Sequence, residues 1–143
     1  NEQIAEVEAL YKQILDEMNT PILSIPGMSY NQAAVIIGGI GDINRFEHSC
    51  QLLAYAGLDP SVIQSGNFQA RSTRMSKRGS GMLRYSLVYS AHNVVKNNKT
   101  FRDYYELKRS QGKSHYCALG HVAHKLVRII FKMLKDNVAF NLD

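Results

Sequence analysis

A cluster of basic side chains lies in the middle of the chain, close enough in sequence to act together. It comprises Arg71, Arg74, Lys77, Arg78 and Arg84, with hydroxyl residues at Ser65, Ser72, Thr73, Ser76 and Ser80. No acidic residue lies between Ser61 and Asp103. Cationic groups neutralise phosphates, and hydroxyls add hydrogen bonds to phosphate oxygens. The cluster is either a solvated charged face or, because compensating acids are missing, a surface that binds nucleic acid.

Residue types suited to catalysis are present, but they form no self-contained set. No carboxylate cluster is present, because Asp42, Glu47, Asp59 and Asp103 are scattered, and this disfavours a two-metal nuclease. No Gly-x-Ser-x-Gly elbow is present. Because the chain holds twelve serines, spacing alone does not single out a nucleophile. A tyrosine nucleophile is a further alternative, at Tyr85, Tyr89, Tyr104 or Tyr105, although no matching arginine and histidine set is found.

Three side chains near the C-terminus have a spacing that could suit a metal ion. Cys117, His121 and His124 are four and three residues apart and would share one helix face, and His115 could add a fourth ligand. The alternative is a face that packs or meets solvent. We favour the packed or solvent-exposed face, and a metal site at these residues stays the open alternative.

Residues 22–42 resemble a helix-hairpin-helix DNA-binding motif. A short apolar helix runs into Pro26-Gly27, and a second helix starts at about Asn31. A tight turn at Gly27 would expose backbone N–H groups at a helix N-terminus, where they can hold a phosphate. Ser29 or Tyr30 stands where the usual motif has a second glycine. The alternative is a plain helical hairpin packed through Ile22, Ile25, Ala34 and Ile37.

Apolar spacing predicts the helices that position these residues. Residues 2–19 carry a heptad seam of Ile4, Val7, Tyr11, Ile14 and Met18, typical of a coiled coil or of a helix packed on its own domain. Further helices are expected over 45–57, with Phe46, Cys50, Leu53 and Ala54 on one face and Gly57 as C-cap, and over 79–97 and 101–111. A last helix follows Ser114, with Leu119, Val122, Leu126, Ile130 and Met133 inward.

We therefore predict a compact all-α domain with an N-terminal coiled-coil-like helix, a helix-hairpin-helix-like segment and a basic insert. The insert, residues 61–78, shows no helical stripe and would be irregular or a small β element. The 143 residues suit one domain, divided as 1–19 for the end of a linker helix and 20–143 for the domain proper. The division of charge is sharper than the net +5 suggests, because fifteen of the seventeen lysines and arginines follow residue 60.

The remaining bulk features exclude other classes. No apolar run approaches the roughly 18 residues needed to span a bilayer. The start of the chain has no secretory signal and no Met, which favours a piece of a longer protein. Cys50 and Cys117 lie far apart, so a disulfide framework is not indicated and a reducing cytoplasm is expected.

The ordered set of motifs resembles the C-terminal transposase domain of the insertion-sequence "one-ten" family of bacterial recombinases. The motifs are Leu-Ser-Ile-Pro-Gly-Met, Ala-Ala-Val-Ile-Ile-Gly-Gly-Ile-Gly-Asp, Gln-Leu-Leu-Ala-Tyr-Ala-Gly-Leu-Asp-Pro, Gln-Ser-Gly and Arg-Met-Ser-Lys-Arg-Gly-Ser-Gly-Met-Leu-Arg. Each piece is weak by itself, but their order over residues 20–140 is specific.

The resemblance implies a serine-type DNA transposase. In such a protein Ser65 of the Ser65-Gly66 pair would attack a DNA phosphodiester, and Gly66 and the basic cluster would hold the DNA. The family's RNase H-like (RuvC-like) N-terminal domain would bind Mg²⁺ through four acidic residues, so no cofactor is expected in this part. The resemblance also implies a guide RNA as partner, dimers or tetramers, no membrane and a bacterial cytoplasm. The rival interpretation is a non-catalytic nucleic-acid-binding module.

Overall fold

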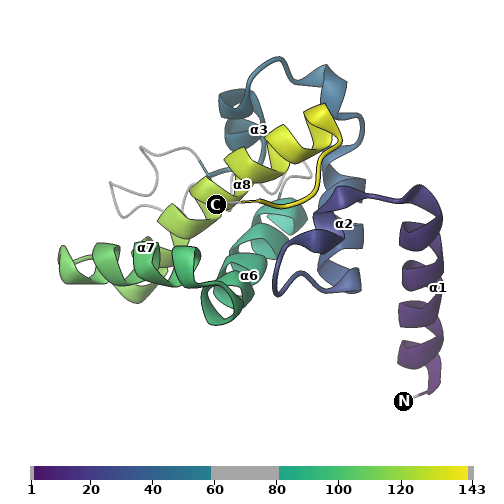
Figure 1. The fold of residues 1–143 in the computed structure, drawn as a ribbon, viewed down its shortest axis with the longest axis horizontal. Coiled ribbons are helices and arrows are strands. Elements are labelled where there is room, and N and C mark those ends of the chain that lie inside the picture. Colours follow the sequence, from purple (N-terminus) through teal and green to yellow (C-terminus); the bar gives the residue numbers. More distant parts are fainter. Residues whose placement is uncertain (1, 59–80, 142–143) are drawn as a thin grey trace.

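The computed structural model describes residues 2–58 and 81–141, and these ranges are all-helical, as the sequence predicts (Figure 1). The elements follow in the order α1 (Glu2–Met18), the 3-10 helix η1 (Pro21–Ser24), α2 (Tyr30–Ile40), the 3-10 helix η2 (Ile43–Arg45), α3 (Ser49–Tyr55), α6 (Gly81–Asn97), α7 (Lys99–Ser110) and α8 (His115–Asp136). No strand occurs among these residues. The insert predicted over 61–78 lies outside the described residues.

Helix α8 runs through the middle of the molecule, with α3, α6 and α7 packed around it (Figure 1). The predicted inward stripe is buried, at Leu119, Val122, Leu126, Ile130 and Met133. The helix begins where the Ser114 hydroxyl accepts a hydrogen bond from the Cys117 N–H at 3.2 Å. It ends at Asn137, whose left-handed φ of 52° turns the chain back along the helix. Burial on several sides makes α8 the scaffold of the fold.

Helix α6 packs against α2 and α8 through the stripe that its sequence predicts. Leu83, Leu87, Ala91 and Val94 are buried. The helices α2 and α6 approach closely at Gly39, where an added Cβ would lie 3.2 Å from the Cβ of Leu83. The buried Ser86 hydroxyl donates to the side-chain oxygen of Gln32, which satisfies a polar pair inside this contact. The start of α6, beside the predicted basic cluster, is therefore firmly placed.

Helix α1 projects from the edge of the molecule and contacts α2 (Figure 1). Leu15 is its one buried residue among those described. The Asn31 side-chain amide donates to Glu8 at 3.3 Å, and Lys12 lies 5.9 Å from the ring centroid of Tyr30. The predicted seam residues Ile4, Val7, Ile14 and Met18 are 44–58 % exposed. The coiled-coil interpretation and the boundary between 1–19 and 20–143 stay predictions.

The helix predicted over 45–57 is shorter than predicted, and only part of its predicted face is buried. The chain first makes the turn η2, held by the Asp42 carboxylate accepting from the Asn44 N–H at 2.9 Å, so α3 starts only at Ser49. Cys50 and Ala54 are exposed.

Two residues of the predicted face are nevertheless buried, Leu53 of α3 and Phe46 before the helix begins, and Leu52 and the C-cap Ala56 are buried with them. The guanidinium of Arg45 lies 4.7 Å from the ring centroids of both Phe46 and Tyr55, which fixes the turn in place of a helical register. The helix also ends before the predicted C-cap: its last residue is Tyr55 and its C-cap is Ala56, and Gly57 follows directly with a φ of 76°.

Candidate nucleic-acid interface

Most residues of the predicted site lie outside the described part of the chain. These are the candidate nucleophile and most of the candidate DNA contacts, namely Ser65, Gly66, Arg71, Arg74, Lys77 and Arg78. Their roles stay predictions. The structure places the two remaining candidates, Gly27 and Arg84, and the basic surface of the C-terminal half.

Gly27 forms the turn between η1 and α2, and α6 packs directly on it. Its φ of 90° is in the left-handed region, and an added Cβ would lie 2.8 Å from the carbonyl oxygen of Asn93. The following helix is capped by Ser29, whose hydroxyl accepts from the Gln32 N–H at 3.1 Å. The turn is thus ordered by packing and by a cap. A phosphate contact at Gly27 stays a prediction.

The alternative of a packed hairpin has a structural basis at the same turn. Ile22 and Ile25 are buried, and Ala34 and Ile37 are partly buried against the core. The segment therefore has a packing role, which neither requires nor excludes a phosphate on the turn.

Arg84 lies in the first turn of α6 and is half-buried. Burial lowers the pKa of the Arg84 guanidinium from its ordinary value. Asn93, which contacts Gly27, follows Arg84 by nine residues, or about 13 Å along a helix axis. The structure therefore places Gly27 and Arg84 near opposite ends of α6 and does not bring them together.

The described C-terminal half carries a strong excess of positive charge. Residues 81–141 hold eleven lysines and arginines against the three acids Asp103, Glu106 and Asp136. Asp103 forms an ion pair with Lys99 at 2.7 Å, so one of these three acids is already neutralised by a neighbouring lysine. Residues 2–58 hold only Lys12 and Arg45 against seven acids. A polyanion would therefore be attracted to the side of the molecule that α6, α7 and α8 form.

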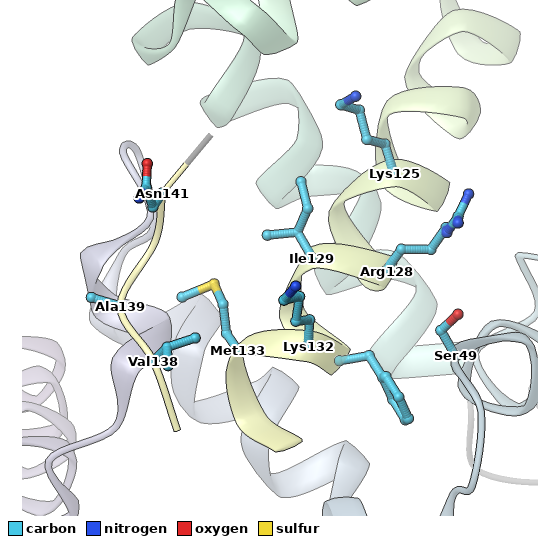
Figure 2. Close-up of a pocket in the computed structure, with 10 residues that line it drawn as sticks. Ser49, Lys125, Arg128, Ile129, Lys132, Met133, Val138, Ala139 and Asn141 are labelled. Carbon is cyan, nitrogen blue, oxygen red and sulfur yellow. The ribbon is translucent and has the colours of Figure 1, made fainter. Parts of the chain in front are cut away.

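A groove of about 830 Å³ lies between α8 and the chain that follows it (Figure 2). Lys125, Arg128 and Lys132 of α8 line it together with the apolar Ile129 and Met133. The opposite wall is formed by Val138, Ala139 and Asn141, and Ser49 of α3 lies at the end near Arg128. None of the described residues that line the groove is an Asp or a Glu.

The sequence analysis missed these groove cations, although a signal was present. Lys125, Arg128 and Lys132 are three and four residues apart, which is the helical period that the apolar stripe of α8 also follows. The groove also requires residues 138–141 and α3 to lie beside α8. The tertiary fold brings these segments together, and sequence spacing does not show it.

The histidines at the other end of α8 lie among basic and aromatic side chains. Within the described ranges, no three His, Cys, Asp or Glu side chains gather to hold a metal ion, and this includes Cys117, His121 and His124. His115 instead shares a hydrogen bond of 2.7 Å with the Tyr105 hydroxyl. Burial, followed by the charges of Lys108 and Lys113, lowers the pKa of His121 from 6.5. His121 is therefore neutral near pH 7.

Two of the tyrosines considered as nucleophiles form an exposed pair on α6. Tyr85 and Tyr89 have ring centroids 6.2 Å apart in a stacked arrangement. Tyr104 is covered by two cations, with Lys108 and Lys125 at 5.3 and 5.0 Å from its ring centroid. These contacts supply aromatic and cationic surface, whereas the hydroxyl of the fourth candidate, Tyr105, shares its hydrogen bond with His115 Nδ1.

None of the helices in the described ranges is long and apolar enough to cross a membrane.

Comparisons with known proteins agree on one family. Residues 19–106 match the family model described as Transposase IS116/IS110/IS902 family. The chain is 35 % identical over 118 residues to the "Transposase for insertion sequence element IS1111A" of Coxiella burnetii, covering 79 % of this chain and 32 % of that protein. It is 28 % identical over 142 residues to the "Insertion element IS110 uncharacterized 43.6 kDa protein" of Streptomyces coelicolor, covering 98 % of this chain and 35 % of that protein. The chain thus spans about a third of the length of these relatives.

Proposed function

Because the chain belongs to the IS116/IS110/IS902 transposase family, we propose that it is the DNA-binding and serine-supplying part of a DNA transposase. The observation that carries the proposal is the family match over residues 19–106, a range that includes Ser65 and the whole basic cluster from Arg71 to Arg84. The excess of lysine and arginine along α6, α7 and α8 supports DNA as the substrate.

In the proposed reaction Ser65 cleaves one DNA strand and keeps one end covalently. A bond forms between the serine Oγ and phosphorus, and the phosphorus–oxygen bond to one deoxyribose breaks. The serine proton goes to a general base, and the leaving oxygen takes up a proton. The phosphoserine conserves a reactive ester for rejoining. Nearby cations such as Arg71 and Arg74 would stabilise the added negative charge of the transition state.

The proposal extends to cofactor, partners and location. We propose that this part of the protein holds no cofactor of its own. Mg²⁺ is assigned to a RuvC-like domain of the same transposase. A guide RNA and a dimeric or tetrameric assembly are proposed as partners, and the bacterial cytoplasm as location. The exposed seam of α1 supports self-association.

The test is the covalent adduct in the natural protein, with every segment that its gene encodes. Ser65→Ala is expected to abolish the protein–DNA adduct that resists denaturing electrophoresis, while DNA binding persists. Ser61→Ala, from the same segment, is the matched control and is expected to keep the adduct. An adduct that survives Ser65→Ala contradicts the assignment. If no adduct forms with any variant while DNA binding is retained, the non-catalytic binding module is favoured instead.

A further inference from the structure

We propose that the groove between α8 and residues 138–141 binds the phosphate backbone of duplex DNA. The contacts are Lys125, Arg128 and Lys132, which lie more than forty residues after the basic cluster 71–84 in the sequence. The inference rests on the proposed function, because it adds a second contact surface for the same DNA. It supplies positioning of the duplex and no chemical step.

The spacing of the three cations suits a repeating anion. At 1.5 Å of rise per residue, Lys125 and Lys132 are about 10.5 Å apart along the α8 axis, with Arg128 between them. One strand of B-DNA carries a phosphate every 3.4 Å or so of helix axis. The row is therefore longer than the axial repeat of the phosphates, so a repeating anion can engage it along its length, whereas a single small anion would engage only part of it.

The electrostatic setting of the groove favours the same ligand. Arg128 and Lys132 are exposed, and no acid occurs among the described lining residues. Lys125 is half-buried, and its ammonium lies 5.0 Å from the centroid of the Tyr104 ring, which restrains its position. Exposed cations in a groove that no described carboxylate lines lose little by exchanging water for phosphate oxygens and release counterions from the DNA.

The wall that residues 138–141 form is held in place by contacts with the rest of the fold, so it needs no ligand to order it. The Val138 N–H donates to the Met133 carbonyl at 3.1 Å, and the Phe140 N–H donates to the Ser24 hydroxyl at 2.8 Å. The Phe140 ring stacks on Phe101 with centroids 6.2 Å apart. A preformed wall lowers the ordering cost of binding.

The experiment measures the salt dependence of binding to a fluorescein-labelled duplex by fluorescence anisotropy. The test variant is Arg128→Gln/Lys132→Gln, because both side chains are exposed and their loss leaves the core intact. The matched control is Lys12→Gln/Lys96→Gln, which removes the same charge from exposed positions on α1 and α6 that do not line the groove. Lys132→Arg, which keeps the charge, serves as the conservative variant. Circular dichroism verifies that each variant is folded.

Loss of two phosphate contacts is expected to weaken duplex binding and to reduce the slope of log K against log salt by about 1.8. The control is expected to change the slope by clearly less, and Lys132→Arg is expected to keep it. Equal losses of duplex binding in the test and control variants overturn the proposal, because the loss would then follow from the change in net charge alone. Unchanged duplex binding together with lost binding of polyglutamate also overturns it, in favour of an acidic protein partner.

A failure of the groove proposal can be distinguished from a failure of the proposed transposase function. The covalent adduct at Ser65 is scored separately in the natural protein, at a low salt concentration where binding is tight. A groove variant that forms the adduct at low salt but loses it at higher salt supports a positioning role.

Discussion

Gly27 occupies a turn in which backbone conformation and packing both exclude a side chain. Its φ is 90°, and an added Cβ would approach the Asn93 carbonyl oxygen to 2.8 Å. Gly27→Ala is therefore expected to lower the free energy of unfolding by about 1–3 kcal/mol, measured by urea denaturation. The sequence pointed to this glycine for a phosphate, and the structure adds a packing reason for it.

The matched control is Gly38, an exposed glycine inside α2 with nothing within 4 Å of an added Cβ. Gly38→Ala is expected to raise the free energy of unfolding by about 0.5–1 kcal/mol, because alanine is the better helix former. Equal stability of Gly27→Ala and the wild type would show that the turn adopts another conformation.

His121 is expected to make the stability of the chain depend on pH. Burial is the main cause that lowers the pKa of His121 below 6.5. The charges of Lys108, Lys113 and His124 lower it further. Its Nε2 is buried without a hydrogen-bond partner among the described residues, which disfavours the protonated ring further. Between the lowered value and 6.5 the unfolded chain binds more protons than the folded chain. The free energy of unfolding therefore falls as the pH drops through this window.

The measurement compares wild type with His121→Gln, which cannot titrate and keeps a polar side chain. The free energy of unfolding is measured above and well below pH 6.5, and we expect it to fall more for the wild type than for the variant. Comparing the two proteins cancels the contributions of other groups, such as His92. A pKa at or above 6.5 for His121 in an NMR titration would refute the prediction.

At the scale of helices, long amphipathic segments could be predicted and short ones could not. The buried stripes of α6 and α8 follow from spacing alone, because each recurs over several turns and fixes which face is inward. The seven residues of α3 make fewer than two full turns. Its position was decided by the η2 turn and by Arg45 packed on Phe46 and Tyr55, which are local contacts that hydrophobic periodicity does not contain.

At the scale of the whole molecule, the charge asymmetry could be predicted and the groove could not. The excess of cations after residue 60 is a count along the sequence, and it indicated a polyanion partner. The groove joins Ser49, the row on α8 and residues 138–141, and these segments are separated by up to ninety residues. Their proximity depends on the packing of Phe140 against Phe101 and on its hydrogen bond to Ser24.

We expect the exposed seam of α1 to contribute to self-association of the whole protein. Ile4, Val7, Ile14 and Met18 are 44–58 % exposed and keep heptad spacing, so a second helix could bury them. Val7→Gln/Ile14→Gln introduces a good helix former at both positions while removing apolar area. Sedimentation velocity of the natural protein is expected to show at least about tenfold weaker self-association, since each buried side chain contributes roughly 1.5 kcal/mol or more.

Ala9→Gln is the matched control for the seam, because position 9 lies on the exposed face of α1 away from it. It changes polarity on the same helix without touching the heptad positions, so self-association should stay at the wild-type level. Two heptads bury too little to hold a coiled coil alone, so the seam would act together with other interfaces. Unchanged self-association in both variants would assign α1 to packing within a single subunit and leave assembly to other surfaces.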